Sequence, residues 1–222
     1  MAMLARVLAE QTLRSLQTVD VMLLGVANDE RRGDLAHFDA ARLREYLRRS
    51  PGEISDVPAM LITDANGEVI ASSDSAPAIA SMARSAAFAR LKSGGDAAVD
   101  GLVRVAGQRR WLLPILHRME TRDGHFAGSV VALLDVGYFE RFYTSVRLGE
   151  EGNVIALHGA DGALLVRHPA RDDAIGQISP RWASGIAGAG REAQPQRFVS
   201  AIDGVERIGI AQPVPGYLLH VV

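Results

Sequence analysis

The stretch from Arg110 to Tyr143 restricts the fold most strongly, because it places two apolar runs, a turn signal and a helix start close together. The first run, Trp111 to His117, is almost wholly apolar, and the second extends from Phe126 to Val136. Asp123-Gly124 stands between them as a turn signal. Two apolar runs joined by a tight turn predict a buried antiparallel hairpin.

Aromatic residues follow the second run at helical spacing. They are Tyr138, Phe139, Phe142 and Tyr143. This spacing predicts that the second strand leads, through Asp135, directly into a short amphipathic helix.

Two helical patterns open the chain. Apolar residues recur every three or four positions from Met3 to about Ala27, which predicts one long amphipathic helix interrupted at Asn28-Asp29 and Arg31-Arg32-Gly33-Asp34. A second pattern, from Leu35 to Leu47, runs to the stop at Ser50-Pro51-Gly52. The apolar stripe of the long helix can pack on its own sheet, or part of it can form a dimer seam with a second copy, and both interpretations stay open.

Strand signals follow the helices. Ala59 to Thr63 and Glu68 to Ser72 flank an Asn66-Gly67 turn, which predicts another hairpin. The Ala-rich segment from Ile79 to Leu91 favours a helix. A strand-rich second part, Leu148 to Val222, ends in an apolar strand.

A weak internal repeat indicates a duplication. Leu61–Ile70 aligns without a gap to Ala156–Leu165, and each segment reads as strand, turn and strand. Val103–Arg110 corresponds roughly to Ser200–Arg207. We therefore expect two related modules.

Composition excludes several classes of protein. A chain of 222 residues with 48% hydrophobic content can bury a sizeable core, and a net charge of −2 without a basic patch gives no reason to expect nucleic acid as a partner. The absence of cysteine excludes disulfides and thiolate chemistry. The longest apolar runs fall short of the roughly 20 residues that span a bilayer, and no signal-peptide pattern opens the chain.

Catalytic and metal-binding patterns are not found. The histidines lack the spacing of a helical metal site, and no motif of a zinc protease, serine hydrolase, P-loop or dinucleotide fold occurs. We predict a chain that is not an enzyme and has no catalytic residue, metal site or cofactor.

The phrases within Arg110–Tyr143 resemble the double Cache (PAS-like) extracytoplasmic sensor domains of bacterial membrane receptors. In that family the core reads as an Arg-Trp strand, an Arg before an Asp-Gly turn, a Phe-x-Gly strand and Leu-Asp-x-x-Tyr-Phe. The matching residues are Arg110-Trp111, Arg118, Asp123-Gly124, Phe126-Ala127-Gly128 and Leu134-Asp135-Val136-Gly137-Tyr138-Phe139.

The resemblance implies an α+β fold, with a long N-terminal helix followed by two tandem PAS-like modules, each with an antiparallel sheet, the second smaller. It implies a helical part at 1–52, a membrane-distal module with the ligand site at 53–147, and a membrane-proximal module at 148–222. It also implies the periplasmic or extracellular portion of a membrane-anchored protein, whose output is a diguanylate cyclase, a histidine kinase or a chemoreceptor.

The candidate ligand-binding residues are chosen partly by their positions in the predicted strands and partly by the family resemblance. Asp135 ends an apolar strand, where a carboxylate either caps the following helix or, as in amine-binding and amino-acid-binding relatives, takes a ligand ammonium. Arg110 and Trp111 alternate across their strand, so only one of them can face the ligand. Arg110 can bind a carboxylate or form a salt bridge, whereas Trp111 can also fill the core. Arg118 is expected to close its strand against a carboxylate of the fold.

Arg84 and Phe88 complete the candidate set. They fall where the family has an Asp-Arg-x-Tyr-Phe-like phrase, but the acid and the tyrosine are missing from Ala83–Phe88. This departure weakens the case for an amino-acid ligand and leaves room for a larger ligand or none. The residues and the resemblance together predict a sensor that binds a small polar molecule, either a carboxylate or an amino-acid-like compound, in its first module. They also predict a homodimer through the N-terminal helix. The alternative is a ligand-free dimerisation or partner-protein platform of the same fold.

Overall fold

Helix α1 (Ala2–Arg32) opens the computed structural model of the chain and is longer than the pattern predicted. Of the two predicted interruptions, the one at Asn28-Asp29 is wrong, because the helix continues through these residues to Arg32, whereas the one that includes Gly33-Asp34 agrees with the observed helix end. Gly33 adopts a φ of 82°, its N–H donates to Glu30 O at 2.8 Å, and Asp34 N–H donates to Asp29 O at 2.9 Å. This left-handed glycine termination satisfies the last helical carbonyls and ends the helix.

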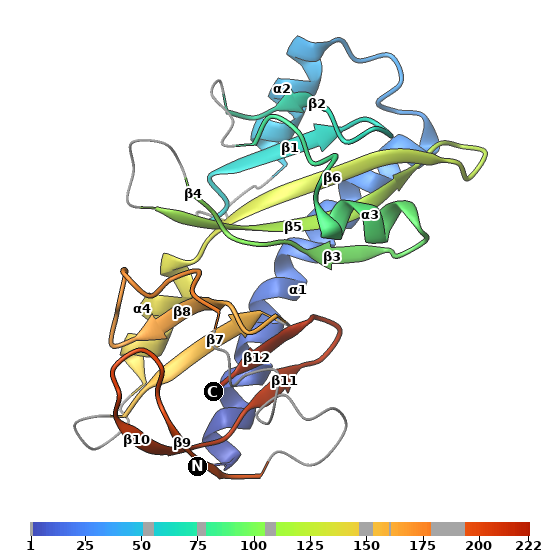
Figure 1. Cartoon of the computed structure of the whole chain (residues 1–222). Helices are drawn as coiled ribbons and strands as arrows, with labels where there is room; N and C mark the ends of the chain where they lie inside the picture. Colours follow the sequence, from blue (N-terminus) through green and yellow to red (C-terminus); the bar gives the residue numbers. More distant parts are fainter. Residues whose placement is uncertain are drawn as a thin grey trace. The chain divides into compact units, whose positions relative to one another are not determined.

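The structure describes residues 2–50, 56–74, 79–104, 110–146, 153–159, 161–178 and 194–222. Contacts divide the chain into two units. The larger unit is Leu16–Asp135, and the smaller unit combines Met1–Ser15 with Val136–Val222. Helix α1 therefore contributes its first half to the smaller unit and its second half to the larger one (Figure 1).

The larger unit contains a six-stranded sheet in the order β2-β1-β6-β5-β3, with β4 also pairing with β5, and its pairings are antiparallel. Its strands are β1 (Ala59–Thr63), β2 (Val69–Ser72), β3 (Ala97–Val99), β4 (Val103–Arg104), β5 (Trp111–Glu120) and β6 (Phe126–Asp135). The long β5–β6 pair is the hairpin that the sequence predicted. The helices that accompany α1 here are α2 (Ala40–Arg49) and α3 (Ala86–Lys92).

Side chains alternate between the two faces of this sheet. Helix α3 packs on one face, which we call the α3 face, and its core consists of Ala59, Leu61, Ile79, Met82, Ala87, Phe88, Leu91, Leu112, Leu116, Val131 and Leu133. Helix α1 lies on the opposite face, the α1 face, where Asp20 Oδ1 is 3.6 Å from His117 Nε2. Both faces are thus covered. This explains why β1 is buried along its whole length and β6 is buried from Gly128 to Asp135.

The segment before α3 departs from its prediction. A helix was expected over Ile79–Leu91, but α3 begins only at Ala86, with the Ser85 hydroxyl accepting from Phe88 N–H. The preceding residues instead pair with the first hairpin, because Val69 N–H donates to Ala80 O and Met82 N–H to Gly67 O. Tertiary hydrogen bonds outweigh the helix propensity of the alanines here.

The smaller unit contains a four-stranded antiparallel sheet in the order β11-β12-β7-β8 and a separate β10-β9 pair. Its strands are β7 (Ile155–Gly159), β8 (Leu164–His168), β9 (Gln196–Val199), β10 (Glu206–Gly209), β11 (Gln212–Val214) and β12 (Leu219–Val221). Helix α4 (Gly137–Ser145) is the predicted aromatic helix. It packs against the first half of α1, where Tyr138 Oη lies 2.8 Å from Ser15 Oγ and Tyr143 Oη 3.2 Å from Thr12 Oγ1.

The duplication seen in the sequence extends to the details of the two sheets. The pairs Leu61↔Ser72 and Thr63↔Val69 of β1–β2 recur 95 positions later as Ala156↔Arg167 and His158↔Leu164 of β7–β8. The register shifts at the corresponding place in both hairpins. The fold is α+β, as predicted, with a larger and a smaller antiparallel sheet.

Candidate functional site

Arg110 and Asp135 form the candidate site in the larger unit. Arg110 Nε lies 2.9 Å from Asp135 Oδ2, and the exposed fraction is 46% for the arginine side chain but 12% for the aspartate. Asp135 ends β6, and its backbone N–H donates to Asp56 O at 2.9 Å. The carboxylate is therefore held at a fixed strand end, while the guanidinium reaches it from the solvent side.

Strand register explains why these two side chains meet. Asp135 pairs with Leu112 of β5, and Leu112 belongs to the core of the α3 face. Side chains two residues apart on a strand share a face, so Arg110, two residues before Leu112, points to the same side. The structure thus places both polar candidates at the edge of the α3 face.

Trp111 lies on the other side of the sheet. It pairs with Arg104 of β4, whose guanidinium carbon is 5.5 Å from the centre of the tryptophan ring. Alternation puts Trp111 on the α1 face with Leu113 and Ile115, away from Asp135. Arg110 and Trp111 do face opposite sides, as alternation predicted, and Arg110 is the one that shares a side with Asp135.

Phe88 and Arg84 occupy different environments. Phe88 is 3% exposed and packs within the core of the α3 face, with its ring edge-on to Phe126 at a centroid distance of 5.6 Å. Arg84 is exposed in the turn that precedes α3. A ligand role for Arg84, Phe88 and Trp111 remains a prediction.

Arg118 closes its strand as expected. Its Nε lies 2.9 Å from Glu120 Oε1, its Nη1 donates to Leu91 O at 2.6 Å, and its guanidinium carbon is 4.8 Å from the centre of the Phe126 ring. These contacts connect β5 to the end of α3 and to Phe126 of β6.

The alternative prediction for Asp135 was that it caps the following helix, which is α4. The N-cap residue of α4 is Val136, whose side chain makes no capping hydrogen bond. Asp135 lies one residue earlier, in the last position of β6. The N-cap position itself is therefore not the reason for an acid at 135.

The chemistry of the pair suits a ligand that carries both charges. A guanidinium binds a carboxylate through two parallel N–H groups, and an aspartate accepts hydrogen bonds from an ammonium. An ion pair with a half-exposed partner contributes at most about 1 kcal/mol to stability. A zwitterion can therefore replace the internal pair with two external pairs at little cost to the fold.

No metal centre accompanies this site within the described residues, since no group of three or more His, Asp or Glu side chains is arranged to hold an ion there. Likewise, no described helix is long and apolar enough to cross a membrane.

One polar cluster of the structure was not predicted from the sequence. Arg167, Asp203 and Arg207 meet in the smaller unit, although 36 positions separate the first two. The only local signal was the Asp203-Gly204 turn dipeptide.

Comparison with known proteins finds relatives by structure. No family model matches the sequence, and no curated protein matches it at a significant level. The extracellular domain of a protein named as a histidine kinase, rpHK1S-Z16, is 26% identical and superposes with a TM-score of 0.81 over 100% of this chain and 90% of that one.

Two chemoreceptor domains of Pseudomonas aeruginosa PAO1 are also similar. The ligand-binding domain of the amino acid chemoreceptor PctC, solved with GABA, is 16% identical with a TM-score of 0.68, covering 98% of this chain and 94% of that one. The domain of PctB, solved with L-Arg, is 17% identical with a TM-score of 0.70, covering 98% and 89%. The chain therefore has the fold of the extracellular sensor domains of histidine kinases and chemoreceptors, the double Cache type of ligand-binding domain.

Proposed function

We propose that this chain is the ligand-sensing domain of a transmembrane signalling receptor, and that it binds a small polar molecule with an amino and a carboxyl group at Asp135 and Arg110. The observation that carries the proposal is the ion pair between a strand-end carboxylate and a half-exposed guanidinium on one face of the sheet. The ligands of PctC and PctB, GABA and L-Arg, each carry both groups.

Ligand binding then exchanges partners without any covalent step. Asp135 keeps its position through the β6 backbone and accepts the ligand ammonium, and Arg110 turns to the ligand carboxylate. The domain itself performs no reaction. The ligand favours one of two arrangements of the larger unit, and the change reaches an output domain such as a histidine kinase, a diguanylate cyclase or a chemoreceptor signalling region.

A thermal-shift screen against amino acids, amines and small carboxylates tests this proposal. A ligand at about 100 times its Kd stabilises the native state by about 2.7 kcal/mol, which raises the Tm of a chain of this size by about 5–10 °C. We expect the shift to be lost in both Asp135→Ala and Arg110→Ala.

The matched control is Arg104→Ala, which removes an exposed arginine that contacts Trp111 instead of Asp135. It should retain the full shift. A ligand-induced Tm shift that persists in both Asp135→Ala and Arg110→Ala would show that the ligand does not bind at Asp135. If no compound shifts the Tm, the ligand-free platform of the same fold is favoured.

The platform alternative rests on α1. Five large apolar side chains on the described part of this helix are exposed. All of them except Leu4 have spacings that keep them on one side of it: Met3 at 83%, Val7 at 52%, Val21 at 71% and Leu24 at 47%. We propose that α1 of a second copy covers this stripe, with or without ligand binding.

Sedimentation equilibrium tests the dimer. Val21→Glu places a charge in the stripe and should raise the dimer dissociation constant at least about 10-fold, since an unpaired charge at an apolar seam costs more than about 1.4 kcal/mol. Val205→Glu, at an exposed valine outside α1, serves as control. Equal association of the two variants would contradict an α1 interface.

A further inference from the structure

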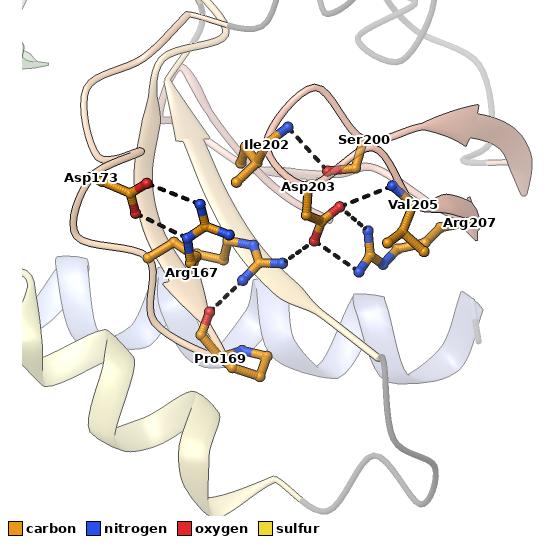
Figure 2. Close-up of polar contacts among 9 residues, drawn as sticks. Arg167, Pro169, Asp173, Ser200, Ile202, Asp203, Val205 and Arg207 are labelled. Atoms are coloured by element: carbon orange, nitrogen blue, oxygen red, sulfur yellow. Dashed lines mark hydrogen bonds and ion pairs between the residues drawn. The ribbon is translucent and has the colours of Figure 1, made fainter.

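Asp203 is held between two arginines in the smaller unit (Figure 2). Arg207 Nη1 and Nη2 donate to its two carboxylate oxygens at 2.6 and 2.9 Å, and Arg167 Nη2 donates to Oδ2 at 2.8 Å. Arg167 also donates to Pro169 O at 2.6 Å through Nη1. A single carboxylate thus accepts from two guanidinium groups, one of them in fork geometry.

The three side chains are largely removed from water. The exposed fraction of the side chain is 7% for Arg167 and 17% for both Asp203 and Arg207. The hydrogen bonds from Arg207 are the main reason that the pKa of Asp203 lies well below its usual range. Within this trio, two positive charges face one negative charge, so removing the carboxylate would leave two partly desolvated cations together.

The neighbouring Arg171–Asp173 pair provides a contrast. Arg171 Nη2 lies 2.9 Å from Asp173 Oδ2, but 42% of the arginine and 67% of the aspartate side chain are exposed. An ion pair with this geometry at the surface contributes little to the free energy of unfolding, because both charges remain solvated.

The duplication identifies the face on which the trio lies. Arg167 of β8 pairs with Ala156 of β7, just as Ser72 pairs with Leu61 in the larger unit. Leu61 belongs to the α3 face, the face that Asp135 and Arg110 share. Ala156 belongs to a small core against which Ile202, the neighbour of Asp203, packs. Arg167 therefore occupies, in the smaller unit, the face that corresponds to the candidate ligand face.

We propose that Arg167 and Arg207 form a carboxylate-binding site in the smaller unit, and that the chain's own Asp203 occupies it as a tethered ligand. The turn between β9 and β10 carries Asp203 into the site, with the Ser200 hydroxyl accepting from Ile202 N–H and Asp203 Oδ1 from Val205 N–H. The site shares no residue with the candidate site at Asp135 and Arg110.

Chemical rescue tests the proposal on the whole chain. Asp203→Ala should lower the Tm by about 10 °C, as expected when one partner of a buried ion pair is removed. Formate or acetate should then restore at least half of this loss, saturably, because a free carboxylate can fill the space that the aspartate leaves between the two arginines. Chloride at the same ionic strength should not.

Two controls distinguish specific carboxylate binding between the two arginines from a general effect of salt. Asp173→Ala should change the Tm little and show no preference for formate over chloride. Adding Arg207→Met to Asp203→Ala should abolish the rescue. If Asp203→Ala alone is unfolded, formate should restore its near-ultraviolet circular dichroism. Equal effects of formate and chloride on Asp203→Ala, or no recovery with either, would show that the trio is a structural ion-pair network and would overturn the proposal.

Discussion

Gly128→Ala should destabilise the larger unit by about 4 kcal/mol and lower its urea midpoint more than Gly25→Ala does. Gly128 lies in β6 with a φ of +125°, a backbone conformation that residues with a side chain rarely adopt. A Cβ atom there would stand 2.1 Å from Thr63 O and 2.7 Å from Asp64 O. Both are backbone atoms of the neighbouring strand and its turn, so no side-chain rotation relieves the contact.

Gly25→Ala is the matched control. Gly25 lies within α1, and a Cβ atom there meets nothing within 4 Å. Because glycine inside a helix costs about 0.5–1 kcal/mol relative to alanine, this variant should be slightly more stable than the parent. A Gly128→Ala protein as stable as Gly25→Ala would mean that β1 and β6 are not packed as described.

Acid should weaken the smaller unit through His158. Burial lowers the pKa of His158 to about 4, below the value of about 6.5 for an exposed histidine, and neighbouring His220 lowers it further while Gly162 O and Asp161 oppose the shift. The neutral ring is therefore favoured in the folded state and the charged ring in the unfolded state. The stability that this difference provides is complete above pH 6.5 and is lost as the pH falls toward 4.

The loss amounts to about 3 kcal/mol over this window, from 1.36 kcal/mol per pKa unit. Urea unfolding at a series of pH values measures it, and His158→Gln should flatten the slope between pH 6.5 and 4. His37→Gln, at an exposed histidine, should retain it. Burial also lowers the pKa of His220 and His117, so some slope will remain in His158→Gln. An unchanged slope in that variant would contradict a buried neutral His158.

Local patterns predicted the elements of this fold well where tertiary structure agrees with them. The Trp111–Asp135 hairpin, the aromatic helix after it and the repeated hairpins all follow from periodicity and turn residues. The residues before α3 illustrate the opposite case, since their alanines favour a helix but their backbone pairs with the first hairpin. Two stop signals were recognised after the first helical pattern, and only the one with Gly33 ends α1, because Asn28 and Asp29 are accommodated within the helix.

The same distinction between local patterns and tertiary contacts applies to the candidate site. Asp135 and Arg110 were found individually, since each stands out beside an apolar strand, but their contact depends on the register of β5 and β6. Arg167 and Asp203 could not be paired from sequence, because nothing local links a strand residue to a turn 36 positions later.

The sharing of α1 between the two units has a practical consequence for receptor engineering. The smaller unit is assembled from two stretches, Met1–Ser15 and Val136–Val222, so a fragment that begins at Val136 lacks the helix that Tyr138 and Tyr143 contact. A chimaera that exchanges sensor halves must graft both stretches together. The junctions belong at Ser15/Leu16 within the helix and at Asp135/Val136 after β6.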